Sequence, residues 1–326
     1  MTEPVSMLNG RDSMGRFAPL ALGLLSLVVL AGCPQAQSVE VTIKKVAGAD
    51  SAEKEGATED AAPAGFGNLL GTVTFEGAPK ELPPIINAGD SSVKDAAICA
   101  AAAVPDESLV VDPASKGIAN VVIFLEKRPG TVKPELAKPP TDPVLFDQKG
   151  CRFMPHVLAV QVGQPLLVVS GDAIPHNTHT NPKRNDSFNK VIGADDRKGV
   201  PCDYKKSEPS PLSVVCDYHP WMKAYHFPVD HPYVAVTDKD GKFKIEGLPA
   251  GKHSFNVWHE RAAGSGQMLE RKLQITIEVD KDTTKDLTYG GTKFAAGSLT
   301  SPQRLVAFES LLSGGSISVS RKEGHQ

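Results

Sequence analysis

Apolar residues in the middle of the chain occur in short runs that Gly, Pro and Asp separate. In the clearest run, Leu273, Ile275, Ile277 and Val279 alternate with polar residues, as in a strand with one buried face. Further β-like runs lie at 68–77, 119–127, 155–172 and 212–216. Because long helical periodicities are rare, the pattern predicts an all-β protein.

One strong turn signal lies in the C-terminal half of the chain. Asp240-Gly241 stands between alternating apolar positions, with Val236 before it and Phe243 after it. Asp-Gly between two alternating runs is typical of a tight turn that joins two paired strands. The sequence therefore predicts a β-hairpin here.

The N-terminus resembles the export signal of a bacterial lipoprotein. Two arginines precede the apolar run 17–30, which is too short for an ordinary membrane span and ends in Leu-Ala-Gly-Cys33. This resemblance to a lipobox implies that residues 1–32 are removed and that Cys33 carries the lipid; the alternative is a simple secretory signal with a chance cysteine. The resemblance implies a bacterial cell envelope protein facing the periplasm or exterior, and Pro34 favours the outer membrane.

The remaining terminal segments do not resemble a folded core. Residues 33–67 are rich in Ala, Glu, Asp and Gly, which predicts a flexible tether between the lipid and the first domain. In the tail, 291–326, we expect one short helix that begins near Ser301-Pro302 and ends near Gly314. Basic and acidic residues number 35 and 38 and are mixed along the chain, so nucleic acid is excluded as a partner.

The segment "VVCDYHPWM" concentrates possible metal ligands. It places Cys216, His219 and Met222 within seven residues, directly after an apolar run. A thiolate, an imidazole and a thioether together suit copper when a second imidazole completes the set. His176 in "DAIPHNTH" supplies one, at the end of the strand pair in 155–172. Without His176, packing of a turn would be the better interpretation.

Residues 145–230 resemble a cupredoxin domain. The run "FMPHVLAVQVGQPL" is similar to the family pattern F-x-P-x-x-L-x-V-x-x-G-x-x-L and leads on to His176-Asn177, while Cys216-x-x-His219-x-x-Met222 is similar to the family's shortest ligand loop. The resemblance implies a Greek-key β-sandwich with one type 1 copper ion. It implies His176, Cys216 and His219 as equatorial ligands and Met222 as the axial ligand.

The same resemblance implies roles for the neighbours of these ligands. Asn177 would tie the two ligand segments together and donate a hydrogen bond near the sulfur. Pro220 and Trp221 would shield the metal, and the outer edge of His219 would be the electron exit.

Residues 231–290 resemble a carboxypeptidase regulatory-like, transthyretin-like β-sandwich. The resemblance lies in "TDKDGKFKIEGLPAG", and 68–130 begins with "GTVTFEG", which is similar to the opening strand of that family. The resemblance implies a second, smaller sandwich that an insertion divides in the sequence.

Other histidines lie near the ligand segments, and their roles stay open. They leave room for a substituted axial ligand, a second metal or interdomain contacts. These residues are His156, His179, His226, His231 and His259.

The five cysteines have separate expected roles. With Cys33 assigned to lipid and Cys216 to metal, an odd number remains. We expect a Cys99–Cys151 disulfide because Cys202 lies in a charged loop, although Cys202 could replace either partner. Only one cysteine lies in the ligand loop, which excludes a dinuclear centre of the oxidase type.

These observations favour a membrane-anchored copper protein that carries single electrons to or from a redox protein such as a cytochrome or a dehydrogenase. We expect no enzyme, since no nucleophile and base pair, paired carboxylates or phosphate-binding loop accompanies the ligand motif. Copper storage or delivery, and a metal-free structural lipoprotein, are the alternatives.

Overall fold

The strands account for nearly all regular structure in the described part of the chain, and the all-β prediction is confirmed. The computed structural model describes residues 64–79 and 81–295, which lie in one contact unit of the chain. The signal segment, Cys33, most of the expected tether and the expected tail helix lie outside the described residues. In the part described, no helix is long and apolar enough to cross a membrane.

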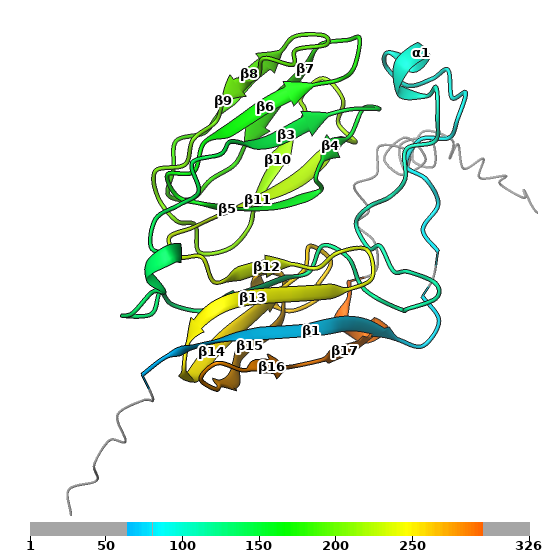
Figure 1. The fold of residues 1–326 in the computed structure, drawn as a ribbon. Helices are drawn as coiled ribbons and strands as arrows, with labels where there is room; N and C mark the ends of the chain where they lie inside the picture. Colours follow the sequence, from blue (N-terminus) through cyan, green and yellow to red (C-terminus); the bar gives the residue numbers. More distant parts are fainter. Residues whose placement is uncertain (1–63, 80, 296–326) are drawn as a thin grey trace, which may run out of the picture. The chain divides into compact units, whose positions relative to one another are not determined.

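Two sheets form the first sandwich (Figure 1). One has the strand order β5-β11-β10-β7-β8, and the other has the order β4-β3-β6-β9. The bounds are β3 (Val144–Gln148), β4 (Phe153–Met154), β5 (Val157–Gln161), β6 (Leu166–Ser170), β7 (His176–Thr180), β8 (Asn189–Ile192), β9 (Val200–Pro201), β10 (Leu212–Val215) and β11 (Lys223–Val229). Alternate residues of both sheets enclose a shared core that includes Phe146, Phe153, Leu166 and Val214.

The two apolar runs on either side of Gly163-Gln164 form strands, as the sequence indicates, but they do not pair with each other. Strand β5 lies beside β11 in one sheet, and β6 lies between β3 and β9 in the other. The turn between them, closed by a bond from the Gln164 N–H to the Gln161 carbonyl, is therefore an arch from one sheet to the other.

The second sandwich is assembled from segments far apart in the sequence. Its first sheet has β1 (Phe66–Glu76) beside β13 (Lys242–Pro249), with β16 (Asp282–Thr284) and β17 (Leu287–Gly290) on the other edge of β1. Its second sheet has the order β12 (Val234–Val236), β2 (Val122–Leu125), β14 (Gly251–Trp258) and β15 (Met268–Ile277). The first sandwich is thus inserted between β2 and β12 of the second.

The second sandwich exceeds its expected bounds at both ends. Strand β1 begins at Phe66, two residues before the run predicted from the sequence. At the other end, the 3-10 helix Gly291–Lys293 leads to Phe294, which is buried and stacks against Phe75 at 5.7 Å. Phe294 therefore belongs to the core of this sandwich, although residues 291–293 and 295 are exposed.

The hairpin prediction at Asp240-Gly241 is wrong. The turn forms, and Gly241 has a φ of 77°, but β12 pairs with β2 while β13 pairs with β1. A Cβ at Gly241 would lie 2.3 Å from the Val73 carbonyl oxygen, because the turn packs directly on β1. Glycine is required at this position because the turn approaches the backbone of β1 so closely. The local sequence pattern does not reveal this contact.

Strands β2 and β11 join the two sandwiches. In β2, Ile123 and Leu125 lie in the core of the second sandwich, whereas Val122 and Phe124 face the other way. They pack against Tyr225, Phe227 and Val229 of β11 together with Trp258. Both faces of β2 are therefore buried, which explains its uninterrupted apolar sequence.

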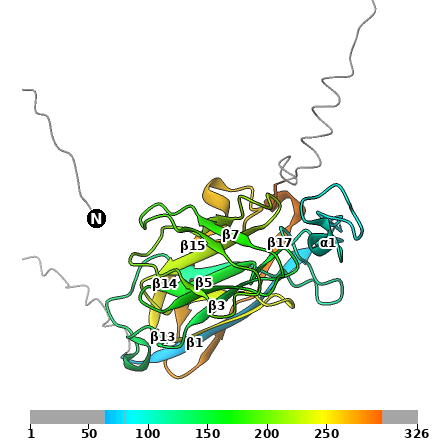
Figure 2. The ribbon, with the colours of Figure 1, turned by 90° about the horizontal axis from the view of Figure 1, so that it is seen from above.

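The helix α1 (Ala96–Cys99) belongs to no sheet and lies to one side of the strands in both views (Figures 1 and 2). It is part of the long connection from β1 to β2. The Cys99–Cys151 disulfide joins this connection to the turn before β4. The disulfide is the pairing that the sequence analysis favoured, and Cys202 is a free, buried thiol.

Removing an aromatic ring at the junction should destabilise the protein. Phe227 is buried and meets Phe124 edge to face at 4.7 Å. We expect Phe227→Ala to lower the free energy of unfolding by about 3–5 kcal/mol, through lost burial and the cavity left behind. Urea unfolding of the metal-free protein measures this. Val191→Ala, at an exposed position, is the control and should change the value by less than about 0.5 kcal/mol. An equal effect of the two substitutions would contradict the packing described.

His226 should make folding sensitive to acid. Its ring is buried with the Tyr204 hydroxyl 2.8 Å from Nδ1, and burial lowers its pKa to about 3. Histidine in the unfolded chain binds a proton near pH 6.5. The contribution of His226 to the free energy of unfolding is therefore complete above that pH and is lost as the pH falls from about 6.5 towards 3. The slope is at most about 1.4 kcal/mol per pH unit for this residue. In His226→Asn, urea unfolding between pH 6.5 and 4 should show a shallower slope; an unchanged slope would count against this role.

Candidate metal centre

Sheet geometry brings the two ligand segments together. His176 begins β7, and Cys216 follows directly after β10. Strands β7 and β10 are antiparallel neighbours, so the start of β7 lies beside the end of β10. The loop after β10 is closed by a bond from the Cys216 N–H to the Met222 carbonyl at 3.2 Å and one from the Met222 N–H to the His219 carbonyl at 2.9 Å. This closed loop turns His219 back over Cys216.

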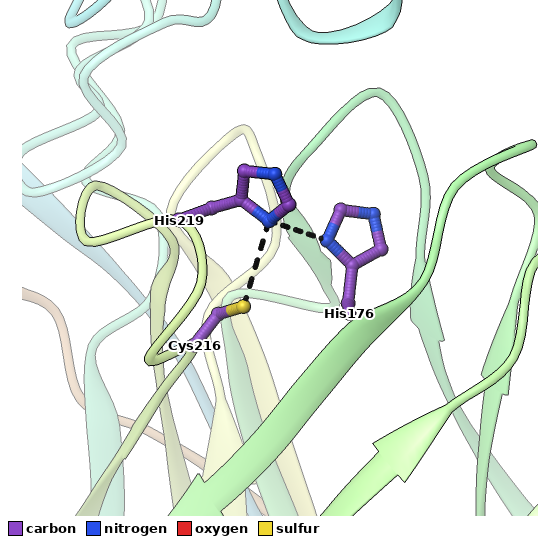
Figure 3. A group of neighbouring side chains, drawn as sticks. All are labelled: His176, Cys216 and His219. Carbon is purple, nitrogen blue, oxygen red and sulfur yellow. Dashed lines mark hydrogen bonds between the residues drawn. The ribbon is translucent and has the colours of Figure 1, made fainter. Parts of the chain in front are cut away.

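His176, Cys216 and His219 form a buried cluster (Figure 3). The His176 Nδ1 lies 3.0 Å from the His219 Nδ1, and the Cys216 Sγ lies 3.7 Å from the same His219 atom. One ligand atom from each of the three residues lies within 4.8 Å of the others. Two imidazole nitrogens and a sulfur therefore converge on one point.

The Cys216 thiol is set up to ionise. Burial alone would raise its pKa, but hydrogen bonds from His176 and His219 and from the Asn177 backbone N–H lower the pKa to about 6. Cys202 lacks such donors apart from Tyr204, and burial raises its pKa to about 12. Since a thiolate is the form that binds metals, Cys216 and not Cys202 has the properties of a ligand.

A carboxylate orients His176 from behind. Asp172 Oδ2 lies 2.9 Å from the His176 Nε2, and the Asp172 carboxylate also accepts the N–H groups of Gly150 and Cys151 at 2.6 and 2.8 Å. Burial would lower the pKa of His176, yet the Asp172 carboxylate and the Cys216 sulfur raise it to about 9. Burial would likewise raise the pKa of Asp172, but the bonds from His176 and the two backbone N–H groups lower it. The Nδ1 side of His176 is therefore the side that faces the cluster.

A second carboxylate lies behind His219. Asp95 Oδ2 is 2.9 Å from the His219 Nε2, although 124 residues separate the two in the chain. His219 is 0% exposed, so its outer edge is not open to solvent. The β1–β2 connection, which carries Asp95, lies against this edge, and its role as the electron exit stays a prediction.

Asn177 links the two ligand segments, as the resemblance implied. Its side-chain oxygen accepts the Asp217 N–H at 2.7 Å, and its amide nitrogen donates to the Asp217 carboxylate at 2.8 Å. Its backbone N–H is also one of the groups that lower the pKa of the Cys216 thiol. The residue thus joins β7 to the ligand loop immediately beside the thiolate.

The remaining residues of the loop have distinct environments. Met222 is buried in the same apolar cluster as Cys216. Trp221 is half-buried, with its ring centre 5.2 Å from that of His219 and its Nε1–H donating to the Cys151 carbonyl at 3.3 Å. Pro220 is exposed, which leaves Trp221 as the shielding residue of the pair.

The other histidines lie elsewhere. Within the described residues, no three-ligand group includes any of them. His179 contacts Asp217 at 3.1 Å, and His226 contacts Tyr204. His231 accepts the Tyr233 N–H, and His259 accepts the Arg261 N–H, both at 3.2 Å. His156 pairs with Glu260 of the second sandwich, so of the open interpretations an interdomain contact is the one that His156 fulfils.

A second group of possible ligands overlaps the first. Cys151, Asp172 and His176 also lie within 4.8 Å of one another. Cys151 is joined to Cys99, however, and a disulfide sulfur is not a thiolate ligand. The cluster that can bind a metal is therefore His176, Cys216 and His219.

Two carboxylates that matter to the site were not assigned a role from the sequence. Asp172 stands four residues before His176 and could have been found from that spacing. Asp95 has no local signal at all. Its only pointer is the expected disulfide, since Cys99 lies four residues after it.

No protein-family model and no curated protein matches the chain. Among solved structures, a Cu-containing nitrite reductase from Thermus scotoductus SA-01 is 20% identical with a TM-score of 0.26, over 30% of this chain and only 27% of that one.

Two other solved structures are similar to a comparable share of the chain. Amicyanin from Paracoccus versutus is 18% identical with a TM-score of 0.24, over 30% of this chain and 96% of that one. A purple cupredoxin from Nitrosopumilus maritimus is 15% identical with a TM-score of 0.22, over 27% and 98%. At these values the likeness assigns neither family nor activity, and the metal centre stands on its own geometry.

Asp172→Asn should weaken metal binding. The substitution removes the negative charge that orients His176, and loss of such an outer partner typically costs about 10–100-fold in metal affinity. Competition with a chromogenic Cu(I) chelator measures the change. Asp147→Asn, on neighbouring β3 and paired with Arg197, is the matched control and should keep the wild-type affinity. Equal affinities for wild type and Asp172→Asn would contradict the orienting role.

Proposed function

We propose that the protein is an extracytoplasmic, lipid-anchored copper protein that carries single electrons through a type 1 site. The observation that carries this proposal is the convergence of one ionisable thiol and two imidazole nitrogens in a buried cluster. Calcium and magnesium prefer oxygen ligands, which this cluster does not offer. A His₂Cys set with a thioether nearby suits copper.

The donor set fits copper in its residue types. His176, Cys216 and His219 would be the equatorial ligands, and Met222, three residues after His219 in the closed loop, would be the axial ligand. Copper in such a site takes up and releases one electron at a time. The chain's part is to keep its donors in place, so that little reorganisation accompanies the change of charge.

Specific contacts perform this task. Asp172 orients the ring of His176, and the backbone N–H of Asn177 stabilises the negative sulfur. The side chain of Asn177 keeps β7 against the ligand loop through Asp217. Burial of all three ligands excludes water from the centre. These features favour a preformed site over one that assembles around its metal.

The same features favour a carrier over an enzyme. His176 and His219 have no exposed surface and Cys216 is 1% exposed, so a substrate has no direct approach to the ligands. We propose a redox protein, such as a cytochrome or a dehydrogenase, as the partner. The Cys99–Cys151 disulfide supports an oxidising compartment, in keeping with the lipoprotein-like N-terminus.

Visible absorption of the purified protein after addition of Cu(II) tests the proposal. We expect an intense sulfur-to-copper charge-transfer band towards the red end of the spectrum. Cys216→Ser should abolish the band because the thiolate is lost. Cys202→Ser, which removes the other free and buried thiol of the described residues, should retain it.

The other outcomes separate the competing functions. A colourless protein that binds and releases Cu(I) would favour storage or delivery. A protein without tight copper binding would leave a structural role. A band that survives in Cys216→Ser would overturn the ligand assignment.

A further inference from the structure

A covalently anchored segment covers the metal centre. Residues 85–104, here called the cap, close on themselves through a bond from the Ile85 N–H to the Val104 carbonyl at 2.8 Å and one from the Val104 N–H to the Ile86 carbonyl at 2.9 Å. Within the cap, the buried residues Ile86, Ala100 and Val104 form a small apolar cluster. The cap therefore has a core of its own and presents a defined surface to the ligand loop.

Besides the contact between Asp95 and His219, three further contacts attach the cap to the site. The disulfide joins Cys99 of the cap to Cys151, whose backbone N–H donates to Asp172. Trp221 of the ligand loop packs against the cap's apolar cluster. The Lys94 ammonium lies 4.9 Å from the centre of the Tyr218 ring. The cap is thus fixed on both sides of His219.

Asp95 has an unusual conformation at the point of contact. It precedes α1 as its N-cap residue, but its φ of 54° lies in the left-handed region, and its side chain makes no capping hydrogen bond to the helix. An N-cap aspartate ordinarily accepts an N–H from the first turn. The Asp95 carboxylate instead meets the His219 Nε2 at 2.9 Å. The helix therefore lacks a stabilising capping bond, and the carboxylate contacts a proposed ligand residue instead. An unusual backbone conformation of this kind points to function.

We infer that Asp95 is a positioning residue of the metal centre, supplied by the cap. Its carboxylate accepts the Nε2–H of His219 and so holds the ring with Nδ1 towards the Cys216 sulfur and the His176 ring. Asp172 does the same for His176 from the opposite segment. A carboxylate behind a ligand histidine fixes the ring and makes it a stronger donor. This inference rests on the proposed function, because it concerns the same ligands.

Two variants separate the carboxylate from the backbone it stands on. Asp95→Gly removes the side chain, and glycine tolerates the left-handed conformation that alanine does not. Asp95→Asn also tolerates it and keeps an acceptor without the charge. Asp90→Asn is the matched control: it changes a carboxylate five residues earlier in the cap, which contacts only Ser92.

Metal ions alone are the probes. We expect Asp95→Gly to lose about 10–100-fold in Cu(I) affinity, Asp95→Asn to lose less, and Asp90→Asn to keep the wild-type value. The Co(II) spectrum should shift in Asp95→Gly because the His219 ring is no longer fixed. The reduction potential of the copper form should rise, since a weaker donor stabilises the oxidised ion less. Nitrogen-15 NMR of the metal-free protein should show a slowly exchanging proton on the His219 Nε2 in wild type and lose it in Asp95→Gly.

The outcomes distinguish the positioning role of Asp95 from the proposed electron-transfer function. Wild-type affinity, Co(II) spectrum and potential in Asp95→Gly would overturn the inference and leave the proposed function intact. A wild-type protein that shows no copper charge-transfer band, but binds Co(II) in a manner that depends on Asp95, would overturn electron transfer and support the positioning role. A wild-type protein that binds neither ion would overturn both.

Discussion

The stabilisation of a buried thiolate is the constraint on which the arrangement of this site depends. Removing a charge from water is unfavourable unless donors replace the lost hydration. Here His176, His219 and the Asn177 N–H do so, and they lower the pKa of Cys216 to about 6 despite its burial. These donors come from two segments, β7 and the loop after β10. The antiparallel pairing of β7 with β10 is what places the second segment within reach.

The rest of the chain reinforces these donors from outside. Asp172 receives two backbone N–H groups of the turn that also contains Cys151, and the disulfide carries the connection on to the cap and Asp95. Both carboxylates therefore belong to one covalently linked system around the two imidazoles. The second sandwich contributes by fixing the ends of that connection, since β1 and β2 lie in its two different sheets. The long β1–β2 connection can then reach the first sandwich and return.

The sequence predicts those features that depend on local order. Strand alternation, the closed loop from Cys216 to Met222 and the position of His176 at a strand edge are all properties of short segments. The pairing of strands, in contrast, depends on segments far apart in the chain. Asp240-Gly241 forms a turn, yet its flanking strands join different sheets. The partner of β13 is β1, whose paired residues lie 170 to 183 positions earlier in the chain. Asp95 escapes prediction for the same reason, since nothing near it in the sequence indicates a distant imidazole.

Burial alone does not distinguish a ligand histidine from a packing histidine. His226 and His176 are both buried, but His226 meets Phe146 and the Tyr204 hydroxyl, and its pKa falls to about 3. His176 meets a carboxylate and a thiol, and its pKa rises to about 9. The two residues have the same side chain, but their pKa values shift in opposite directions because of side chains contributed by other strands and loops. The assignment of His176 to the candidate metal centre therefore depends on Asp172 and Cys216 as much as on the histidine itself.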